Sequence, residues 1–494
     1  MKTWLNRILA LAAGALYPLS QAPFDWPAIS LVSVAGLCLL LRTTDVRETF
    51  WRSFWYAAGL FTVGASWVYV SIHIYGEAPA PLAVALTGVF IVTLSLCFAA
   101  PFLLYGRLDR RHPLASFALF PSIWVLGEWF RGWFLTGFPW LYLGNSFIDT
   151  PLVGWAPLGG VLWLSWIGAA TAAALATVFH SRGHKPAVLA ALLTVCLFWL
   201  WAQTLEDREW TQPVGQARSV AMLQPAVPLM QKWDQNALMD ILDLYSAEME
   251  PLWQTDLVIW PESAIPELQH RVQPYLDWLD RQARRHDTTL ITGIPTRRDG
   301  AYFNSVIALG SGDGRYDKRH LVPFGEYVPL EHWLRGTIRF FDLPMSTFTA
   351  GADRQPLLKT EDLRIATAIC YEIVYQDMLA GPATEANILL TVSNDTWFGN
   401  SIGPHQHFQA ARMRAMENAK PLLRATNDGI SAIIDHRGKV TARVPQFQRT
   451  VLKGEITPRE GSTPFNRWGS WPVLGLSLLF VAAGLLAGRR HGES

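Results

Sequence analysis

Charged residues are scarce in this 494-residue chain, because Asp, Glu, Lys and Arg together make up 16% of it, against roughly 25% in soluble proteins. The formal net charge is +1, so the charge balance indicates no nucleic-acid partner. The four cysteines are widely spaced and form neither a disulfide framework nor a zinc pattern. A glycine-rich phosphate loop of the P-loop kind is also missing. We therefore expect no metal or nucleotide cofactor.

Hydrophobic and aromatic residues are abundant instead. Half of the chain is hydrophobic, and 23 residues are tryptophan. Low charge combined with many tryptophans is typical of membrane proteins, whose aromatic rings lie at the lipid interface.

Eight hydrophobic segments predict a bundle of about eight transmembrane helices. Several approach the roughly 20 residues that a helix needs to cross the hydrocarbon core, whereas the first two are short. The first segment has a basic start and small residues near its end, so a signal peptide is the alternative there. The segments are 6–20, 28–42, 53–75, 80–105, 113–132, 152–180, 186–203 and 471–488.

The basic residues alternate between successive loops. Every second loop contains Lys or Arg, whereas "QAPFDWP", "IYGEAPAP" and "FLTGFPWLYLGNSFIDTP" contain neither. The positive-inside rule then places both termini in the cytoplasm. We expect a seven-helix transmembrane region over 1–204, a domain on the non-cytoplasmic side over 205–465, and a last helix with a short cytoplasmic tail over 466–494.

The region 205–465 has the pattern of a mixed α/β domain. Its strand-like runs are nearly continuously apolar, as in a sheet covered on both faces, and amphipathic stretches between them predict helices. The expected strands are "SVAMLQP", "DLVIWPES", "TTLITGIP", "FNSVIALG", "LRIATAIC" and "NILLTVSND", and the expected helices are "WDQNALMDILDLYSAEM", "VQPYLDWLDRQARR" and "GPHQHFQAARMRAMENA".

Three reactive side chains lie at predicted strand ends or in the loops beside them: Glu262, Lys318 and Cys370. Functional groups in open α/β sheets gather beyond the carboxyl ends of strands. A carboxylate can deprotonate a thiol, and an ammonium can stabilise the oxyanion that forms when sulfur attacks a carbonyl. Cys370 is expected to begin a helix whose dipole favours thiolate, with the Tyr371 N–H as a second oxyanion donor. The alternative is a buried structural cysteine and two solvated surface charges.

The motifs "WPESAIP", "YDKRHLVPFGEYVP" and "AICYEIVYQD" occur in an order and spacing that resemble the carbon–nitrogen hydrolase (nitrilase) superfamily. With seven helices before them and one after, "LVPFGEYVP" looks like the bacterial apolipoprotein N-acyltransferase family. The resemblance implies an αββα sandwich on a membrane bundle in the bacterial inner membrane, facing the periplasm. It also implies acyl transfer from the sn-1 position of a phospholipid to the N-terminal amine of a diacylglyceryl-cysteine apolipoprotein.

The same resemblance implies a role for each motif residue. Glu262 is the implied general base, Lys318 the oxyanion stabiliser and Cys370 the nucleophile that carries the acyl group as a thioester. The supporting residues are Glu326, which positions the lysine, Tyr371 and Glu372, which shape the pocket beside the thioester, Trp233 near the substrate entrance, and Asn304 at the site.

An aromatic segment follows the lysine motif, "VPLEHWLRGTIRFFDLPMSTFTAG". Phe340 and Phe341, with Trp333, Leu343 and Met345, suggest a flap that dips into lipid and guides acyl chains. The alternative is an ordinary loop folded on its own core.

Other motifs carry weaker indications. His405 and His407 face different sides of the predicted helix and lack a third ligand, so we expect no metal site. Glu128 lies inside a predicted span, where a charge suggests function, or it pairs with Arg131. Phe138 to Trp140 are expected to anchor at the interface rather than to line a lipid entrance.

Two other functions fit part of the pattern. The same triad serves a membrane-anchored amidase, although one anchoring helix suffices for that. A transporter with a binding module is disfavoured, because the segments contain few charges and no paired broken helices.

Overall fold

The structure is a computed structural model that describes residues 2–108, 112–179, 184–329 and 347–492. Its internal contacts divide the chain into two compact units. Unit 1 comprises Met1–Tyr69, Ala80–Glu209 and Trp468–Ser494, and unit 2 comprises Val70–Pro79 and Trp210–Arg467. The sequence placed residues 70–79 with the transmembrane region, whereas their contacts group them with the α/β unit.

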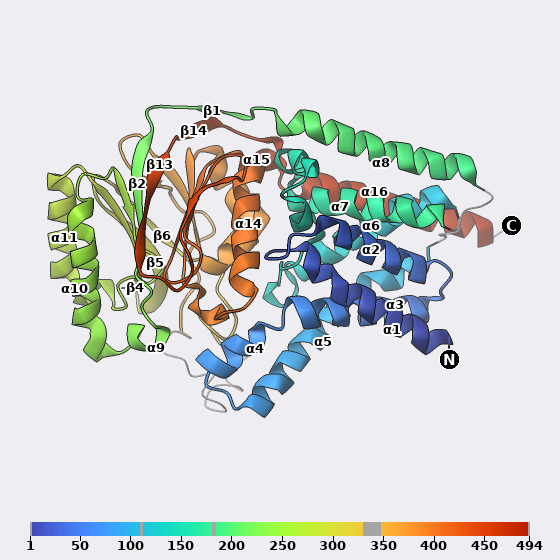
Figure 1. The fold of residues 1–494 in the computed structure, drawn as a ribbon, viewed down its shortest axis with the longest axis horizontal. Helices are drawn as coiled ribbons and strands as arrows, with labels where there is room; N and C mark the ends of the chain where they lie inside the picture. The colour runs from blue at the N-terminus through green and yellow to red at the C-terminus, as the bar shows by residue number, and fades with distance from the viewer. Residues whose placement is uncertain (1, 109–111, 180–183, 330–346, 493–494) are drawn as a thin grey trace. The chain divides into compact units, whose positions relative to one another are not determined.

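The described part of unit 1 consists mainly of helices, and each of the eight apolar segments contains all or part of one of them (Figure 1). The helices are α1 (Lys2–Leu16), α2 (Pro27–Leu41), α3 (Val46–Gly64), α5 (Ala80–Tyr105), α6 (Pro113–Arg131), α7 (Ala156–Val178), α8 (Lys185–Glu206) and α16 (Trp471–Gly492), and the short α4 (Val68–Val70) follows α3.

Fewer helices than expected are long enough to cross a membrane. Among the described residues four helices pass by length and hydropathy, or five if α3 and the bent stretch Val68–Tyr75 form one span. The first two helices have 15 residues each, which at about 1.5 Å per residue covers roughly 22 Å of a hydrocarbon core about 30 Å thick. The prediction of about eight transmembrane helices is therefore not confirmed.

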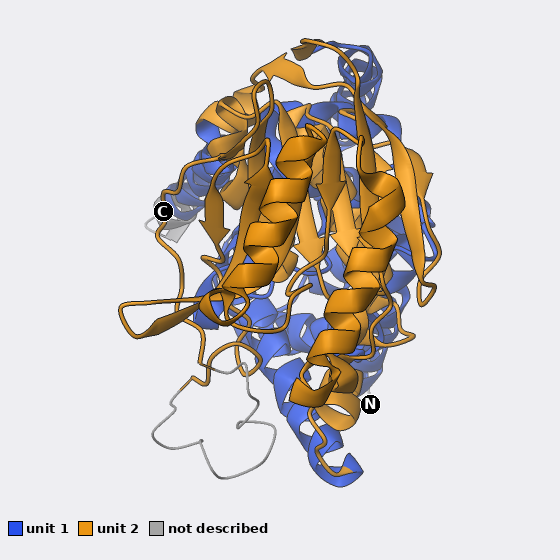
Figure 2. Ribbon diagram, turned by 90° about the vertical axis from the view of Figure 1, so that its left-hand side faces the viewer, with its two compact units in different colours: residues 1–69, 80–209, 468–494 blue, residues 70–79, 210–467 orange. Residues whose placement is uncertain are grey.

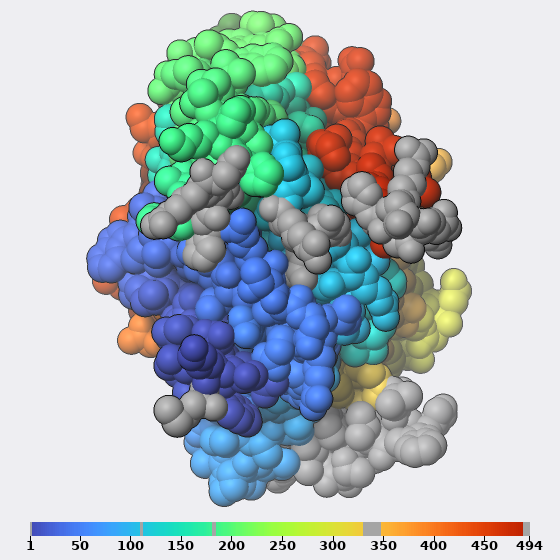
Figure 3. Space-filling model, turned by 90° about the vertical axis from the view of Figure 1, so that its right-hand side faces the viewer, coloured from blue at the N-terminus to red at the C-terminus, as the bar shows by residue number. Residues whose placement is uncertain are grey.

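The outer surface of α8 is apolar, as lipid contact requires. Its exposed side chains recur every three or four residues along one face and are Leu189, Leu193, Leu197, Leu200 and Trp201; Figure 3 shows the surface of this helix in green. A helix on the surface of a soluble protein carries polar residues on that face, so this helix suits a bilayer.

Buried polar groups hold the loop after α6. Arg131 Nη1 donates hydrogen bonds to the carbonyl oxygens of Phe138 (2.6 Å) and Trp140 (2.5 Å). The Glu128 carboxylate accepts one from the backbone N–H of Leu143 (2.7 Å). The rings of Phe138 and Trp140 are buried and stacked on each other. They therefore serve the packing of the protein, and the expectation that they anchor at the lipid interface is wrong.

The described residues of unit 2 form two six-stranded sheets and a short ribbon, with the strands in the predicted places. The first sheet runs β13 (Thr450–Ile456), β2 (Arg218–Gln224), β3 (Leu257–Ile259), β4 (Thr289–Arg298), β5 (Ala301–Gly310), β6 (Arg315–Asp317). The second runs β12 (Val440–Arg443), β11 (Ala432–Ile434), β10 (Leu422–Thr426), β9 (Ile388–Ser393), β8 (Arg364–Ile369), β7 (Leu358–Lys359). The ribbon pairs β1 (Thr211–Pro213) with β14 (Arg459–Gly461).

The centre of each sheet is parallel. Strands β2, β3 and β4 pair in parallel in the first sheet, and β8, β9 and β10 do so in the second. These strands are almost entirely buried, which explains their continuous apolar runs.

Helices cover the outer faces of the two sheets. One hydrophobic core mixes side chains of both sheets, including Ile259, Ile291, Ile369 and Leu423. A second core packs α10 and α11 against the first sheet, and Figure 2 shows this face. Outside the undescribed stretch 330–346, the α-helices between residues 210 and 467 are α9 (Leu229–Lys232), α10 (Leu238–Met249), α11 (Gln273–Arg285), α13 (Gln376–Ala380), α14 (Gly403–Asn418) and α15 (Pro464–Trp468). Since α14 packs against β10 of the second sheet, the layers are the αββα that the resemblance implied.

Candidate active site

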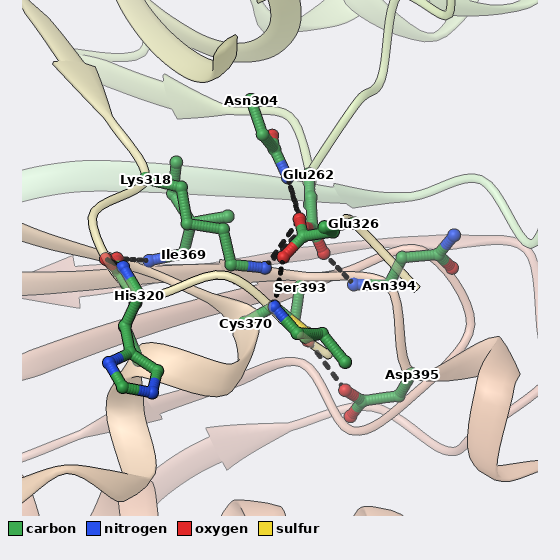
Figure 4. Close-up of polar contacts among 12 residues, drawn as sticks. Glu262, Asn304, Lys318, His320, Glu326, Ile369, Cys370, Ser393, Asn394 and Asp395 are labelled. Carbon is green, nitrogen blue, oxygen red and sulfur yellow. Dashed lines mark hydrogen bonds and ion pairs between the residues drawn. The ribbon is translucent and has the colours of Figure 1, made fainter. Parts of the chain in front are cut away.

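The three reactive residues lie beyond strand ends, as the sequence predicted. Lys318 follows β6 directly, Cys370 follows β8, and Glu262 comes three residues after β3. Strands β3 and β6 belong to the first sheet, whereas β8 belongs to the second. Figure 4 shows the three side chains gathered in one cluster. The packing of the two sheets therefore brings the trio together.

A glycine allows the Glu262 segment to lie close to β4. A Cβ atom on Gly293 would lie 2.5 Å from the backbone nitrogen of Ser263 and 2.6 Å from the carbonyl oxygen of Pro261. Any other residue at this position would push the Glu262 backbone away from the strand. The glycine thus sets the position of the carboxylate.

One lysine is shared by two buried carboxylates. Lys318 Nζ lies 2.9 Å from Glu326 Oε1 and 3.4 Å from Glu262 Oε1. The amide nitrogen of Asn304 donates to the same two oxygens, at 2.9 Å and 2.8 Å respectively. Glu262 Oε2 accepts from the backbone N–H of Asn394 at 2.9 Å. The structure therefore places Glu326 and Asn304 in one cluster with Glu262 and Lys318.

The surroundings of the cluster favour the charged form of the Lys318 ammonium and the neutral form of the Cys370 thiol. Burial disfavours the charged form of Lys318, but the carboxylates of Glu326 and Glu262 outweigh it and raise the lysine pKa above its usual value. Burial, and then the charge of Glu262, raise the pKa of the Cys370 thiol, with Lys318 acting in the opposite direction. Burial therefore favours the neutral thiol of Cys370, whereas the two carboxylates favour the charged form of Lys318.

The backbone at Cys370 is a sharp strand-to-helix turn. Cys370 has φ +52°, in the left-handed region, which non-glycine residues adopt mainly where the surrounding structure imposes it. In place of the expected helix, a five-residue 3-10 helix, Cys370–Val374, follows the strand, and the pKa of the Cys370 thiol is raised rather than lowered. The raised thiol pKa corrects that part of the prediction.

Glu372 lies behind the site rather than in a pocket. It is completely buried, and its carboxylate accepts from the backbone N–H groups of Arg319 (2.7 Å), His320 (3.1 Å) and Ile369 (2.7 Å). It therefore ties the segment after Lys318 to the strand before Cys370. The neighbouring Tyr371 is 9% exposed and packs its ring near His320.

Lys232 is a site residue that the sequence pattern did not indicate. It is buried, and its ammonium donates to the carbonyl oxygen of Glu262 at 2.8 Å. Burial lowers the pKa of Lys232 to about 8, although the charges of Glu262 and Asp428 favour its charged form. Its only signal was its place next to Trp233, which is half-buried at the end of α9.

The structure also bears on the expected flap and on the two histidines, His405 and His407. The flap residues Phe340, Phe341, Trp333, Leu343 and Met345 lie outside the described residues, so that part of the site stays a prediction. No cluster of metal-ligating side chains occurs in the described ranges. His407 is instead fully buried and hydrogen-bonded within unit 2.

Family models match most of the chain. Residues 219–464 match the carbon-nitrogen hydrolase model, and residues 13–174 match the apolipoprotein N-acyltransferase N-terminal domain.

Curated relatives are similar over nearly the full length. The apolipoprotein N-acyltransferase of Azotobacter vinelandii is 48% identical, over 99% of this chain and 96% of its own. Those of Pseudomonas syringae pv. tomato and Coxiella burnetii are 45% and 38% identical, over 98% and 97% of this chain and 97% and 99% of theirs.

Among solved structures, the CN-hydrolase superfamily protein XC1258 from Xanthomonas campestris is 21% identical with a TM-score of 0.39, covering 49% of this chain and 91% of its own. Saccharomyces cerevisiae Nit3, of the nitrilase superfamily, is 18% identical with a TM-score of 0.38, covering 50% and 92%.

Proposed function

The chain belongs to the apolipoprotein N-acyltransferase family, and on that premise we propose that Cys370 carries an acyl chain from a membrane phospholipid to a lipoprotein amine. The acceptor is the N-terminal amine of a diacylglyceryl-cysteine apolipoprotein, and the link is a thioester. The observation that carries this proposal is the buried cluster in which Lys318 contacts both Glu326 and Glu262 beside the cysteine. Such a cluster supplies a base, a cation and a nucleophile at one point.

In the first half-reaction Glu262 takes the proton from the Cys370 thiol, and the sulfur bonds to the carbonyl carbon of the sn-1 ester. The carbonyl oxygen becomes an oxyanion, which the Lys318 ammonium and the Tyr371 N–H stabilise. The ester C–O bond then breaks, and the leaving lysophospholipid oxygen receives the proton from Glu262. The raised pKa of Lys318 supports a lysine that acts as a cation and not as a proton donor.

In the second half-reaction the lipoprotein amine attacks the thioester carbon. Glu262 accepts a proton from the amine, a C–N bond forms, and the C–S bond breaks. The sulfur leaves as thiolate and regains the proton from Glu262. This is ping-pong catalysis through a covalent intermediate, and the proposed steps use no metal or nucleotide.

Both proposed substrates carry acyl chains and reside in the bilayer, and the apolar helices of unit 1 would keep the enzyme there with them. Keeping an acyl chain in the bilayer saves about 0.8 kcal/mol per CH₂ group relative to water. The proposed setting is the bacterial inner membrane, crossed several times, with both termini in the cytoplasm and the catalytic unit in the periplasm. The alternation of basic loops supports that orientation.

Mass spectrometry of the acyl-enzyme tests the first half-reaction. Purified protein is incubated with labelled phospholipid, and a thioester is sought on Cys370. Cys370→Ser is expected to abolish the adduct, whereas Cys196→Ser, which changes an exposed cysteine of unit 1, is the matched control and leaves it in place. An adduct that survives in Cys370→Ser contradicts the proposal.

Addition of a diacylglyceryl peptide tests the second half-reaction. An N-acyl amide product supports the acyltransferase. Accumulation of free fatty acid alone favours the membrane-anchored carbon–nitrogen hydrolase.

A further inference from the structure

A buried histidine contacts the backbone of the nucleophile. His407 lies on α14 with an exposed fraction of 0%, and its Nε2 is 3.0 Å from the carbonyl oxygen of Cys370. A carbonyl oxygen only accepts hydrogen bonds, so Nε2 carries the proton and donates. The two residues are 37 positions apart in the sequence, which is why no local pattern indicates this contact.

The other side of the imidazole is held by a charged pair. His407 Nδ1 lies 2.9 Å from Asp395 Oδ1 and 3.1 Å from a guanidinium nitrogen of Arg424. Arg424 also donates to Asp395 Oδ2 at 2.6 Å, and Ser393 Oγ to Asp395 Oδ1 at 2.6 Å. Figure 4 shows Ser393 and Asp395 next to Cys370. All the side chains of this network are buried.

Two proton arrangements of the ring fit these contacts, and Nε2 is a donor in both of them. A neutral ring protonated at Nε2 accepts at Nδ1 from Arg424, and a doubly protonated ring donates from Nδ1 to Asp395. Burial opposes the carboxylate charge, but Arg424 and then His407 lower the pKa of Asp395 well below its ordinary value. The anion that orients the ring therefore persists across the working pH range.

The carbonyl that His407 holds belongs to the same peptide unit as the N–H of Tyr371. Because the unit is planar and trans, its C=O and N–H point in opposite directions, so fixing one fixes the other. A hydrogen bond to the carbonyl also polarises the amide and strengthens its N–H as a donor. The turn needs such support, since Cys370 has φ +52°.

We propose that His407 is a positioning residue for acyl transfer: by donating to the Cys370 carbonyl it aims the Tyr371 N–H at the oxyanion. The inference rests on the proposed thioester chemistry and adds to it a residue that neither touches the substrate nor transfers a proton during the reaction. It also accounts for a histidine that the sequence offered only as a doubtful metal ligand.

Replacing His407 by Asn or by Gln tests the roles of its two ring nitrogens one at a time. In His407→Asn the amide replaces Nδ1, so the Asp395 side is kept and the donor to Cys370 is lost. In His407→Gln the amide reaches the place of Nε2 and restores that donor. His405→Asn, on the same helix at a half-buried position, is the matched control and is expected to react at the wild-type rate.

Two reactions of the full-length protein in detergent–phospholipid micelles are compared at one pH. The first is acyl transfer to a diacylglyceryl peptide, which passes through an oxyanion. The second is alkylation of Cys370 by iodoacetamide, which displaces iodide at a saturated carbon and forms no oxyanion.

For His407→Asn we expect kcat for acyl transfer to fall roughly tenfold to a hundredfold, somewhat less than the roughly 10²–10³ that loss of a direct oxyanion donor costs. The KM for phospholipid should stay unchanged because the oxyanion exists only in the transition state. Alkylation should stay within twofold of wild type, and His407→Gln should recover most of the lost kcat.

Other results overturn the inference. A parallel loss of alkylation and acyl transfer shows that His407 merely holds the cysteine or the fold, and so does a Gln variant as slow as the Asn variant. Unchanged acyl transfer in His407→Asn removes the role altogether. If the Asn variant does not fold, His407→Met against His407→Gln makes the same comparison. A wild-type protein that alkylates but never acylates contradicts the proposed function instead, so the two failures are distinguishable.

Discussion

Removal of the Lys318 charge is expected to affect stability and activity together, and a second substitution should separate them. Lys318→Met takes away the cation that lies 2.9 Å from Glu326 and 3.4 Å from Glu262. Lys318 is 1% exposed, and each carboxylate residue is 7% exposed. Two negative charges would then share a buried site in which Asn304 is their common neutral donor.

The expected loss is large for a single substitution. Breaking a buried ion pair from one side costs about 3–5 kcal/mol, because an uncompensated charge remains. With about 2–4 °C per kcal/mol for a unit of this size, the apparent melting temperature of the catalytic unit should fall by roughly 6–20 °C. The sign of its pH dependence follows from like-charge repulsion, which raises a carboxyl pKa in the variant. The deficit is therefore full above that pKa and shrinks as the pH falls and one carboxylate is protonated.

The double variant Lys318→Met with Glu326→Gln removes one charge of each sign. It should recover about 0.5–3 kcal/mol of the loss, the range found for coupled neighbours, while acyl transfer stays absent because no cation faces the oxyanion. Thermal unfolding followed by intrinsic fluorescence, at pH 5.5 and pH 8, measures both effects. A Lys318→Met variant that melts within 2 °C of wild type, or a double variant no more stable than the single one, refutes the assignment of Lys318 as the shared counter-ion.

Three further substitutions test separate parts of the site. Gly293→Ala should lower the rate of acyl transfer at least tenfold, because its Cβ would lie 2.5 Å from the backbone nitrogen of Ser263, next to Glu262. Gly381→Ala, whose Cβ would have no atom within 4 Å, should react at the wild-type rate in the same assay. Equal rates for the two variants contradict this account of Gly293. In Glu262→Gln, labelling of Cys370 by iodoacetamide should rise about tenfold per pH unit between pH 7 and 9, because burial, the largest cause of the raised thiol pKa, remains when the Glu262 charge is removed, and ionisation below a pKa follows that slope. A flat profile, measured by mass spectrometry, shows that the thiolate forms without the base. Glu372→Gln should destabilise the protein by about 1.5–3 kcal/mol, the contribution of a charge-assisted hydrogen bond, in a thermal melt; an unchanged melt means that this carboxylate does not tie the two segments together.

The membrane character and the strands of the α/β unit were predictable from local pattern. Continuous apolar runs identify β3, β8 and β9 because these strands are buried on both faces. The lengths of the helices were harder to predict from the sequence, because a hydrophobic run continues through bends and short 3-10 turns. The bend between α3 and Val68–Tyr75 is 58°, and the segment 53–75 reads as one run in the sequence.

The order of the three motifs is enough to identify Glu262, Lys318 and Cys370 as candidate site residues, because each lies in a recognisable motif near a strand end. Their chemistry depends on contacts between distant parts of the chain. The N–H that binds Glu262 belongs to Asn394, 132 residues away, and the ring that holds the Cys370 carbonyl comes from another helix.

The sequence by itself determined which residues are the reactive candidates, since side-chain type and strand endings are local properties. Only the tertiary structure decided the direction in which the thiol pKa is shifted, the sharing of one lysine by two carboxylates, and the place of Glu372 behind the site. Each of these depends on burial and on distances of about 3 Å between segments that are far apart in the chain, and spacing along a chain does not encode such distances.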